Sequence, residues 1–214
     1  MCIKNSFLLR FATASLLILS TVNGPAFAAK GGVKTPEHPE PFVAAILMDA
    51  DTGQIIFQHN PDRRHSPASL VKKMLMLIVA ESVKQEAFSL DQNVHITRAA
   101  SRIGGSQVYL KQGEIFKLGD LLKTVTIASA NDSAYAIAEH IAGTPEAMVQ
   151  LMNERAKELG LKKTIFTNVH GLPPGAGQKE DYITAQDASV IAREIVKYPL
   201  LLNWGKTVLD TFRG

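Results

Sequence analysis

Cysteine is almost absent from this sequence of 214 residues, in which Cys2 is the only one. A lone thiol excludes both an internal disulfide and a zinc site made of several thiolates. The histidines do not compensate, because His59, His65, His95 and His140 are scattered without the spacing of metal ligands. We therefore predict no metal and no other cofactor.

The sequence also lacks a strong charge imbalance and, after its first 28 residues, a long apolar segment. The formal net charge of +3 falls to +1 if the cations Lys4 and Arg10 are removed with a leader. Proteins that bind nucleic acid through its phosphates are typically far more basic. No later apolar run approaches the ~20 residues that span a bilayer. We predict neither a nucleic-acid partner nor a membrane anchor.

The N-terminal segment has the pattern of a secretory signal peptide. Lys4 and Arg10 accompany the short apolar stretch ATASLLILSTV, and the small residues AFA that follow suit cleavage. The apolar stretch is too short for a transmembrane helix, which is the alternative. We therefore divide the chain into a signal peptide at 1–28, a flexible arm rich in Gly and Pro at 29–42, and one folded domain at 43–214.

The folded domain is expected to begin with short strands and to continue mainly as helices. A hairpin is predicted at 43–49 and 54–58, because Asp51-Thr52-Gly53 between them is typical of a turn. A helix is predicted from Pro67, with Ser66 as its N-cap, and its apolar residues on nearly every face require burial. Further helices are predicted at 117–129, 131–143, 145–160 and 184–198, the last one ended by Pro199, with a loop of short extended pieces at 101–116.

The start of the buried helix carries a serine and a lysine three residues apart, Ser69 and Lys72. Ser69 would lie in the first turn, where unpaired N–H groups and the helix dipole stabilise negative charge. Burial would lower the pKa of a neighbouring lysine and provide a neutral amine that takes the serine proton. Lys72 and Lys73 lie about 60° and about 40° around the helix from Ser69, so geometry leaves the choice open. A capping serine and a solvent-exposed lysine are the alternative interpretation.

A second polar cluster, Ser129-Ala130-Asn131, lies between two predicted helices about sixty residues farther along the chain. A hydroxyl and an amide on such a tight turn can relay a proton and hold a substrate amide. Serine and asparagine are also common turn and cap residues for local reasons. Neither cluster indicates catalysis by itself.

Together the two clusters resemble the penicillin-recognising serine acyl-enzymes, whose signature is S-x-x-K, then S-x-N, then K-T-G. The resemblance extends over MDADTGQIIFQHNPDRRHSPASLVKKM, GGSQVYLKQGE, LLKTVTIASANDSAYAIAEHIAG, MNERAKELGLKKTIFTNVHGL and YITAQDASVIAREI. These segments are similar to the D-alanyl-D-alanine carboxypeptidases among the low-molecular-mass penicillin-binding proteins, from about Phe42 to Gly214. The resemblance also selects Lys72 over Lys73.

The resemblance implies roles for four residues. Ser69 is the nucleophile that becomes acylated and Lys72 is its general base, while Ser129 passes protons to the leaving group. Asn131 holds the substrate backbone and orients Lys72. The implied reaction removes the terminal D-alanine of the peptidoglycan pentapeptide, with β-lactams as pseudo-substrates, in the periplasm or cell-wall space. The loop His170-Gly171-Leu172 matches a family motif to which we assign no chemistry, and we expect its histidine to bond backbone.

The chain departs from the family pattern at the third motif. WGKTV contains Lys206-Thr207, but Val208 follows where glycine is required, so we interpret it as a chance match. The implied fold is α+β and transpeptidase- or β-lactamase-like, a five-stranded antiparallel sheet flanked by helices with a helical subdomain. Its later strands would follow Gly214, so we expect an incomplete domain. We likewise expect no C-terminal amphipathic anchor of the kind found in many relatives.

Two other functions remain open from the sequence. One is a non-catalytic protein that binds wall peptide or penicillin and keeps Ser69. The resemblance implies that the K-T-G strand supplies an N–H to the oxyanion, and loss of one such donor costs about 10²–10³ in rate. The other is a β-lactamase, which needs a deacylating carboxylate that the sequence does not place.

Overall fold

The structure is a computed structural model and describes residues 42–175, 177 and 179–213. The predicted signal peptide and nearly all of the predicted arm lie outside the described residues. The division of the chain at residues 28 and 42 therefore stays a prediction. All four predicted site residues are described.

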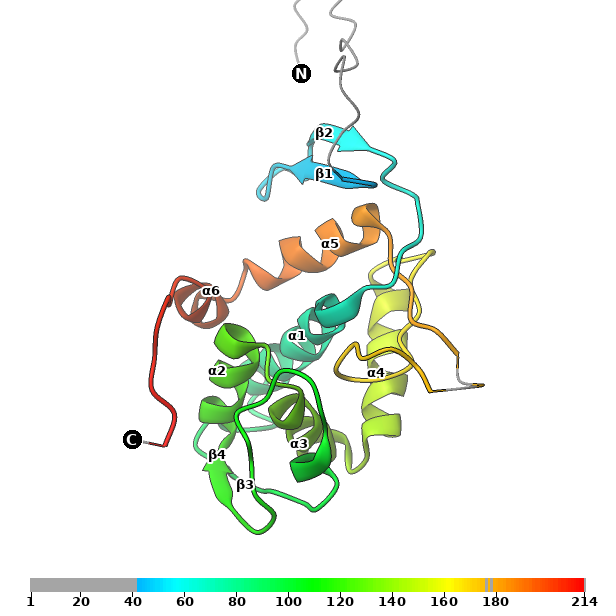
Figure 1. The fold of residues 1–214 in the computed structure, drawn as a ribbon. Coiled ribbons are helices and arrows are strands. Elements are labelled where there is room, and N and C mark those ends of the chain that lie inside the picture. The colour runs from blue at the N-terminus through cyan, green and yellow to red at the C-terminus, as the bar shows by residue number, and fades with distance from the viewer. Residues whose placement is uncertain (1–41, 176, 178, 214) are drawn as a thin grey trace, which may run out of the picture. The chain divides into compact units, whose positions relative to one another are not determined.

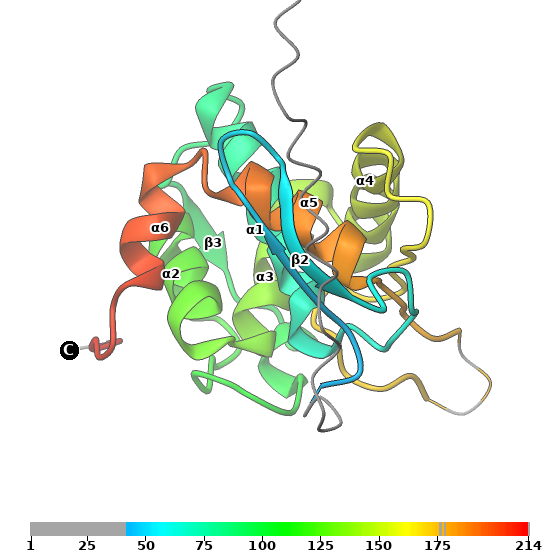
Figure 2. The same cartoon turned by 90° about the horizontal axis from the view of Figure 1, so that it is seen from above.

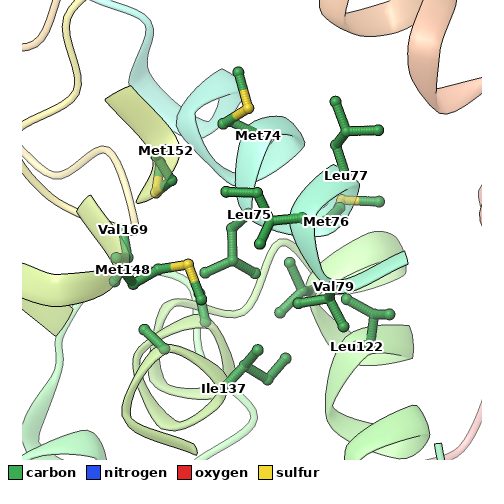
Figure 3. Close-up of a cluster of buried hydrophobic side chains, with 14 of the residues drawn as sticks. Met74, Leu75, Met76, Leu77, Val79, Leu122, Ile137, Met148, Met152 and Val169 are labelled. Atoms are coloured by element: carbon green, nitrogen blue, oxygen red, sulfur yellow. The ribbon is translucent and has the colours of Figure 1, made fainter. Parts of the chain in front are cut away.

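Helix α1 (Val71–Lys84) is the centre of the domain. Its residues are apolar around most of the circumference, so it is stable only when other elements cover it. Four helices pack against it (Figure 1): α2 (Leu118–Ala128), α3 (Asn131–Ala142), α4 (Pro145–Glu158) and α5 (Ala185–Ile195). Figure 3 shows Leu75 and Val79 of α1 among side chains from three of these helices, including Leu122, Ile137 and Met148. The prediction of a buried helix is confirmed.

Local signals place the ends of the surrounding helices. Helices α2 and α3 meet at Ser129 and Ala130, as predicted. Gly143 has φ +83° and ends α3 with a backbone conformation that favours glycine. Thr144 then caps α4, because its side-chain oxygen accepts a hydrogen bond from the Ala147 amide at 3.1 Å. Short connections thus join α2, α3 and α4, and all three helices contact α1.

A β-hairpin covers the outer side of α5. Strands β1 (Ala45–Met48) and β2 (Ile55–His59) pair antiparallel, and Figures 1 and 2 show α5 between this hairpin and α1. Arg193 of α5 donates hydrogen bonds to the carbonyls of Ala50 and Asp51 in the hairpin turn, at 2.8 and 2.7 Å. Within the described residues this sheet has two strands, and the α+β class is confirmed.

One local prediction was wrong, and two were incomplete. Ser66 does not cap the first helix: a 3₁₀ turn (η1, Ala68–Leu70) precedes α1, and Pro67 flanks that turn. Helix α5 does end before Pro199, but this proline also supplies the first residue of an unpredicted helix, α6 (Pro199–Gly205), where its fixed φ fits. The segment before α2 contains a small antiparallel ribbon, β3 (Asn93–His95) with β4 (Ile115–Lys117), besides a second 3₁₀ turn, η2 (Ala100–Arg102). The 3₁₀ turns and the three-residue strands are too short to give a periodic signal in the sequence.

Candidate active site

Ser69 and Lys72 meet at the junction of η1 and α1. The Lys72 ammonium nitrogen Nζ donates to Ser69 Oγ at 3.0 Å. Ser69 is exposed, whereas only 2% of Lys72 is exposed, so the serine faces solvent and its partner is covered. Lys73 is exposed and lines a separate groove with residues of α5. The structure therefore places Lys72, and not Lys73, against Ser69.

Burial changes the pKa of the Lys72 amine in the direction that favours proton transfer. Desolvation penalises the ammonium form and lowers the pKa of Lys72 from 10.5 to about 8. About one-tenth of such amines are neutral at pH 7, against about one in three thousand for an ordinary lysine. The amine also donates to the carbonyl oxygen of His170 at 2.7 Å, which fixes its direction. A neutral, oriented amine beside a serine hydroxyl is the arrangement of an activated nucleophile.

The backbone just before Ser69 is strained. Ala68 has φ +45°, a left-handed conformation that costs about 1–2 kcal/mol for a residue with a Cβ. Gly171, with φ +79°, packs directly against it: a Cβ at position 171 would lie 1.8 Å from the Ala68 carbonyl oxygen. Only a glycine permits this approach. The strained residue and the glycine together fix where the Ser69 hydroxyl points.

One loop, 167–172, contacts both Lys72 and the residue just before Ser69. It reaches Lys72 through the His170 carbonyl and Ala68 through Gly171. The His170 ring points into its own loop, because Nδ1 accepts from the Leu172 amide at 3.1 Å. Burial and the Lys72 charge lower the pKa of His170, which agrees with an unprotonated Nδ1. The expectation that His170 bonds backbone is confirmed, while the contribution of its carbonyl and of Gly171 was missed.

Ser129 and Asn131 flank the start of α3. Ser129 has φ +55° and is partly exposed. Asn131 is buried, its amide nitrogen Nδ2 donates to the Gly104 carbonyl at 2.8 Å, and its backbone N–H donates to the Ser106 carbonyl at 2.7 Å. Among the described residues no hydrogen bond connects either side chain to Ser69 or Lys72. The roles of Ser129 and Asn131 therefore stay predictions.

Asp132 organises the loop beside Asn131. From the sequence we expect Asp132 at a helix N-terminus, and Asp132 does lie in the first turn of α3. Its carboxylate also accepts hydrogen bonds from the backbone amides of Val108 and Leu110, at 3.2 and 3.0 Å. The loop 104–110 is thus fixed to α3 next to Asn131.

Within the part of the chain that the structure describes, no hydrogen bond joins Lys206 or Thr207 to any of the four predicted site residues. Lys206 is the C-cap of α6, and its backbone N–H donates to the Leu202 and Asn203 carbonyls in a helical turn. The described residues also contain no group of three or more His, Cys, Asp or Glu side chains that could hold a metal ion. No helix in the same part of the chain is long and apolar enough to cross a membrane.

Comparison with known proteins assigns the chain to a family. The family model for D-alanyl-D-alanine carboxypeptidases, peptidase family S11, matches residues 34–213. The chain belongs to this family. The carboxypeptidase DacF of Bacillus subtilis strain 168 is 36% identical to it over 197 residues, which are 92% of this chain and 50% of DacF. DacC of Escherichia coli K12 is 34% identical over 89% of this chain and 48% of DacC.

Solved structures of D-alanyl-D-alanine carboxypeptidases and penicillin-binding proteins share the fold. The carboxypeptidase DacD from Francisella tularensis superimposes with a TM-score of 0.74 at 37% identity, over 78% of this chain and 40% of that protein. Penicillin-binding protein 6B from Escherichia coli gives a TM-score of 0.74 at 32% identity, over 84% and 59%. The predicted transpeptidase-like fold is confirmed. The chain spans about half the length of the curated relatives it matches.

Proposed function

We propose that this chain carries the acylation site of a serine D-alanyl-D-alanine carboxypeptidase. The observation that supports this best is the 3.0 Å hydrogen bond between Lys72 Nζ and Ser69 Oγ, made by a buried lysine with a pKa of about 8. Membership of the carboxypeptidase family supplies the reaction class.

The proposed reaction begins when the neutral Lys72 amine takes the proton of the Ser69 hydroxyl. The Ser69 oxygen attacks the carbonyl carbon of the penultimate D-alanine, and the helix N-terminus stabilises the developing oxyanion. The proton held by Lys72 then passes through the Ser129 hydroxyl to the nitrogen of the terminal D-alanine, which leaves as an amine, while Asn131 holds the peptide backbone. Water then cleaves the Ser69 ester and restores the hydroxyl.

The proposed substrate is the pentapeptide stem of peptidoglycan, and β-lactams are proposed as pseudo-substrates that acylate the same oxygen. The names of the matched carboxypeptidases and penicillin-binding proteins support both. This substrate lies outside the cytoplasmic membrane, and we propose that the chain is exported to the periplasm or cell-wall space. The N-terminal pattern of cations, apolar stretch and small residues supports export.

A fluorescent penicillin tests the acylation site. We expect covalent labelling of the wild type and of Ser66→Ala, a matched control three residues away, but no labelling of Ser69→Ala. Mass spectrometry of a proteolytic digest should place the adduct on Ser69. A folded wild-type protein that stays unlabelled would contradict the proposal.

Release of D-alanine distinguishes the carboxypeptidase from the other functions. A pentapeptide ending in D-Ala-D-Ala should lose one D-alanine per turnover. Stable label without D-alanine release would indicate a binding protein, whereas rapid loss of label with hydrolysis of the antibiotic would indicate a β-lactamase.

A further inference from the structure

Two side chains that the proposed reaction does not use, the half-buried Asn168 and the buried Asp181, hold loop 167–172 in place. Asn168 Oδ1 accepts hydrogen bonds from the backbone amides of His170 and Gly171, at 3.0 and 2.6 Å. These are the two residues through which the loop contacts Lys72 and Ala68. Asn168 therefore determines the position of both contacts.

Asp181 in turn holds Asn168. The Asn168 amide nitrogen Nδ2 donates to Asp181 Oδ2 at 2.6 Å. The other carboxylate oxygen accepts from the hydroxyl of Thr167 at 3.0 Å and from the Thr167 backbone N–H at 2.5 Å. Asp181 is 6% exposed, so these bonds replace water that the carboxylate has lost, and breaking one leaves a buried charge with too few partners.

We propose that Asn168 and Asp181 are positioning residues that set the Lys72 amine against Ser69 through the backbone of loop 167–172. The proposal rests on the proposed function for its consequence in catalysis. A neutral amine has two N–H donors and one lone pair. When one donor is fixed on the His170 carbonyl, rotation about the Cε–Nζ bond is restricted, and the lone pair can be directed at the serine hydroxyl.

The pair offers an exchange of isosteric side chains as its test. In Asn168→Asp two carboxylates face each other, and in Asp181→Asn two amides compete for the same donors and acceptors. The double variant Asn168→Asp/Asp181→Asn restores one carboxylate facing one amide. Misplacement of a catalytic group by about 1 Å costs ~10²-fold, so we expect each single variant to acylate with penicillin about 10²-fold more slowly. The double variant should recover at least about ten-fold of that loss.

The pKa of Lys72 gives a readout that general destabilisation does not move. It is followed by NMR of ¹³C-labelled lysine, with the Lys72 signal assigned from its loss in Lys72→Met. Lys72 interacts electrostatically with the ring of His170, which in turn interacts with Asp181. A displaced loop admits water to Nζ and relieves desolvation, so the midpoint should move from about 8 toward 10.5 in each single variant and return in the double variant.

Asp187 supplies the matched control. Its carboxylate is 8% exposed and accepts from the Lys163 backbone N–H at 3.0 Å and the Thr164 hydroxyl at 2.8 Å, a setting close to that of Asp181. Among the described residues no hydrogen bond connects Asp187 to loop 167–172. Asp187→Asn should lower stability without changing acylation or the Lys72 titration.

The outcomes separate this proposal from the proposed function. The positioning role is overturned if Asn168→Asp and Asp181→Asn show the same acylation rate and the same Lys72 titration midpoint as Asp187→Asn. A wild type that is not acylated overturns the proposed function, while the Lys72 titration still decides the positioning role. If circular dichroism shows that the single variants are unfolded, Thr167→Val carries the test, because it removes one donor to Asp181. It should slow acylation about five-fold and raise the Lys72 midpoint; unchanged values overturn the proposal.

Discussion

Lys72 occupies a position where stability alone favours an apolar side chain. It lies in the first turn of a helix whose other inward residues are Val, Met, Leu and Ile, and it is as buried as they are. Its pKa is lowered because the folded protein penalises the ammonium form. The same penalty reduces the free energy of unfolding wherever the lysine is charged in both states.

We therefore predict that Lys72→Met stabilises the protein at neutral pH. The folded state releases the Lys72 proton at about 8 and the unfolded state at about 10.5. The cost is fully present below pH 8 and is relieved as the pH rises to 10.5, because the unfolded state binds more protons in that interval. We expect the free energy of unfolding in urea to rise by about 1–3 kcal/mol at pH 7, with a smaller gain at pH 10.

The exposed neighbour gives the control for this prediction. Lys73→Met should change stability by less than about 0.5 kcal/mol and without this pH dependence. A Lys72→Met protein that unfolds more easily than wild type at pH 7 would show that the hydrogen bonds to Ser69 and His170 outweigh the burial cost.

Gly171 is predicted to be intolerant of any side chain. In Gly171→Ala the added Cβ would lie 1.8 Å from the Ala68 carbonyl oxygen, so loop 167–172 or the backbone before Ser69 must move. Overpacking of this kind costs about 1–3 kcal/mol, and we expect penicillin acylation to fall about 10²-fold because the Ser69 hydroxyl shifts. Gly160→Ala is the matched control: its φ of +74° is similar, but its Cβ would meet nothing within 4 Å. It should lose stability while acylation stays normal.

The sequence predicted that a lysine would meet Ser69, but it did not predict the contacts that hold the pair. Spacing on the helix and the apolar surrounding predict a desolvated lysine beside Ser69, and the family resemblance was needed to choose Lys72 over Lys73. The supporting contacts join Lys72 to position 170 and Asn168 to position 181. No periodic pattern in the sequence predicts contacts between such distant positions. Resemblance pointed to the loop at 170–172, yet its contribution lies in a carbonyl and an absent Cβ, which side-chain chemistry does not reveal.

At the scale of elements, one arginine of α5 binds the turn of the hairpin. Arg193 binds the Ala50 and Asp51 carbonyls through two nitrogens, and a Cβ on Gly53 would lie 2.7 Å from its guanidinium. Lysine has one nitrogen and cannot make both bonds with the same planar geometry. Arg193 therefore joins the hairpin turn to α5 with two hydrogen bonds.

We predict that Arg193→Lys loosens the hairpin without unfolding the rest of the domain. The amide protons of Asp49 and Gly53, which close the turn, should exchange with deuterium about ten-fold faster, because local opening becomes cheaper by about 1.4 kcal/mol. The amides of α1 should keep their protection. Arg155→Lys, which alters an ion pair with Glu81 elsewhere in the domain, is the control. If the amides of Asp49 and Gly53 exchange at the same rate in wild type and in Arg193→Lys, Arg193 does not stabilise the hairpin turn.

The helices were predictable because the signals for their ends are local. The strands were only partly predictable. Capping residues, glycine and proline lie within a few positions of each helix end, and α2, α3 and α4 were predicted to within about two residues of their observed bounds. The ribbon β3–β4 has strands of three residues whose partners are about twenty positions apart. Its stability comes from that pairing and not from a pattern within either strand.

At the scale of the whole molecule, the described part of the chain leaves apolar surface uncovered around the hairpin. Leu47 and Phe57 are paired across the strands, and 54% and 38% of them are exposed. On the side of α5, a groove of about 500 Å³ lies between β1 and α5, lined by Ile46, Met48 and Leu70 among others. Within the described residues both outer edges of this sheet are also unpaired. Exposed apolar faces and open strand edges promote association.

We predict that Leu47→Thr/Phe57→Thr lowers self-association of the folded protein. Threonine keeps the β-branched shape that suits a strand while removing the apolar surface. Sedimentation at rising protein concentration and the fluorescence of a hydrophobic dye should both show less association and less binding than wild type. Val208→Thr/Leu209→Thr tests exposure alone, because those side chains are 96% and 88% exposed but lie outside the sheet. If the second pair reduces association as much as the first, scattered exposed residues and not the hairpin face cause it. Penicillin labelling of Ser69 should be the same in both double variants, since neither touches Lys72 or loop 167–172.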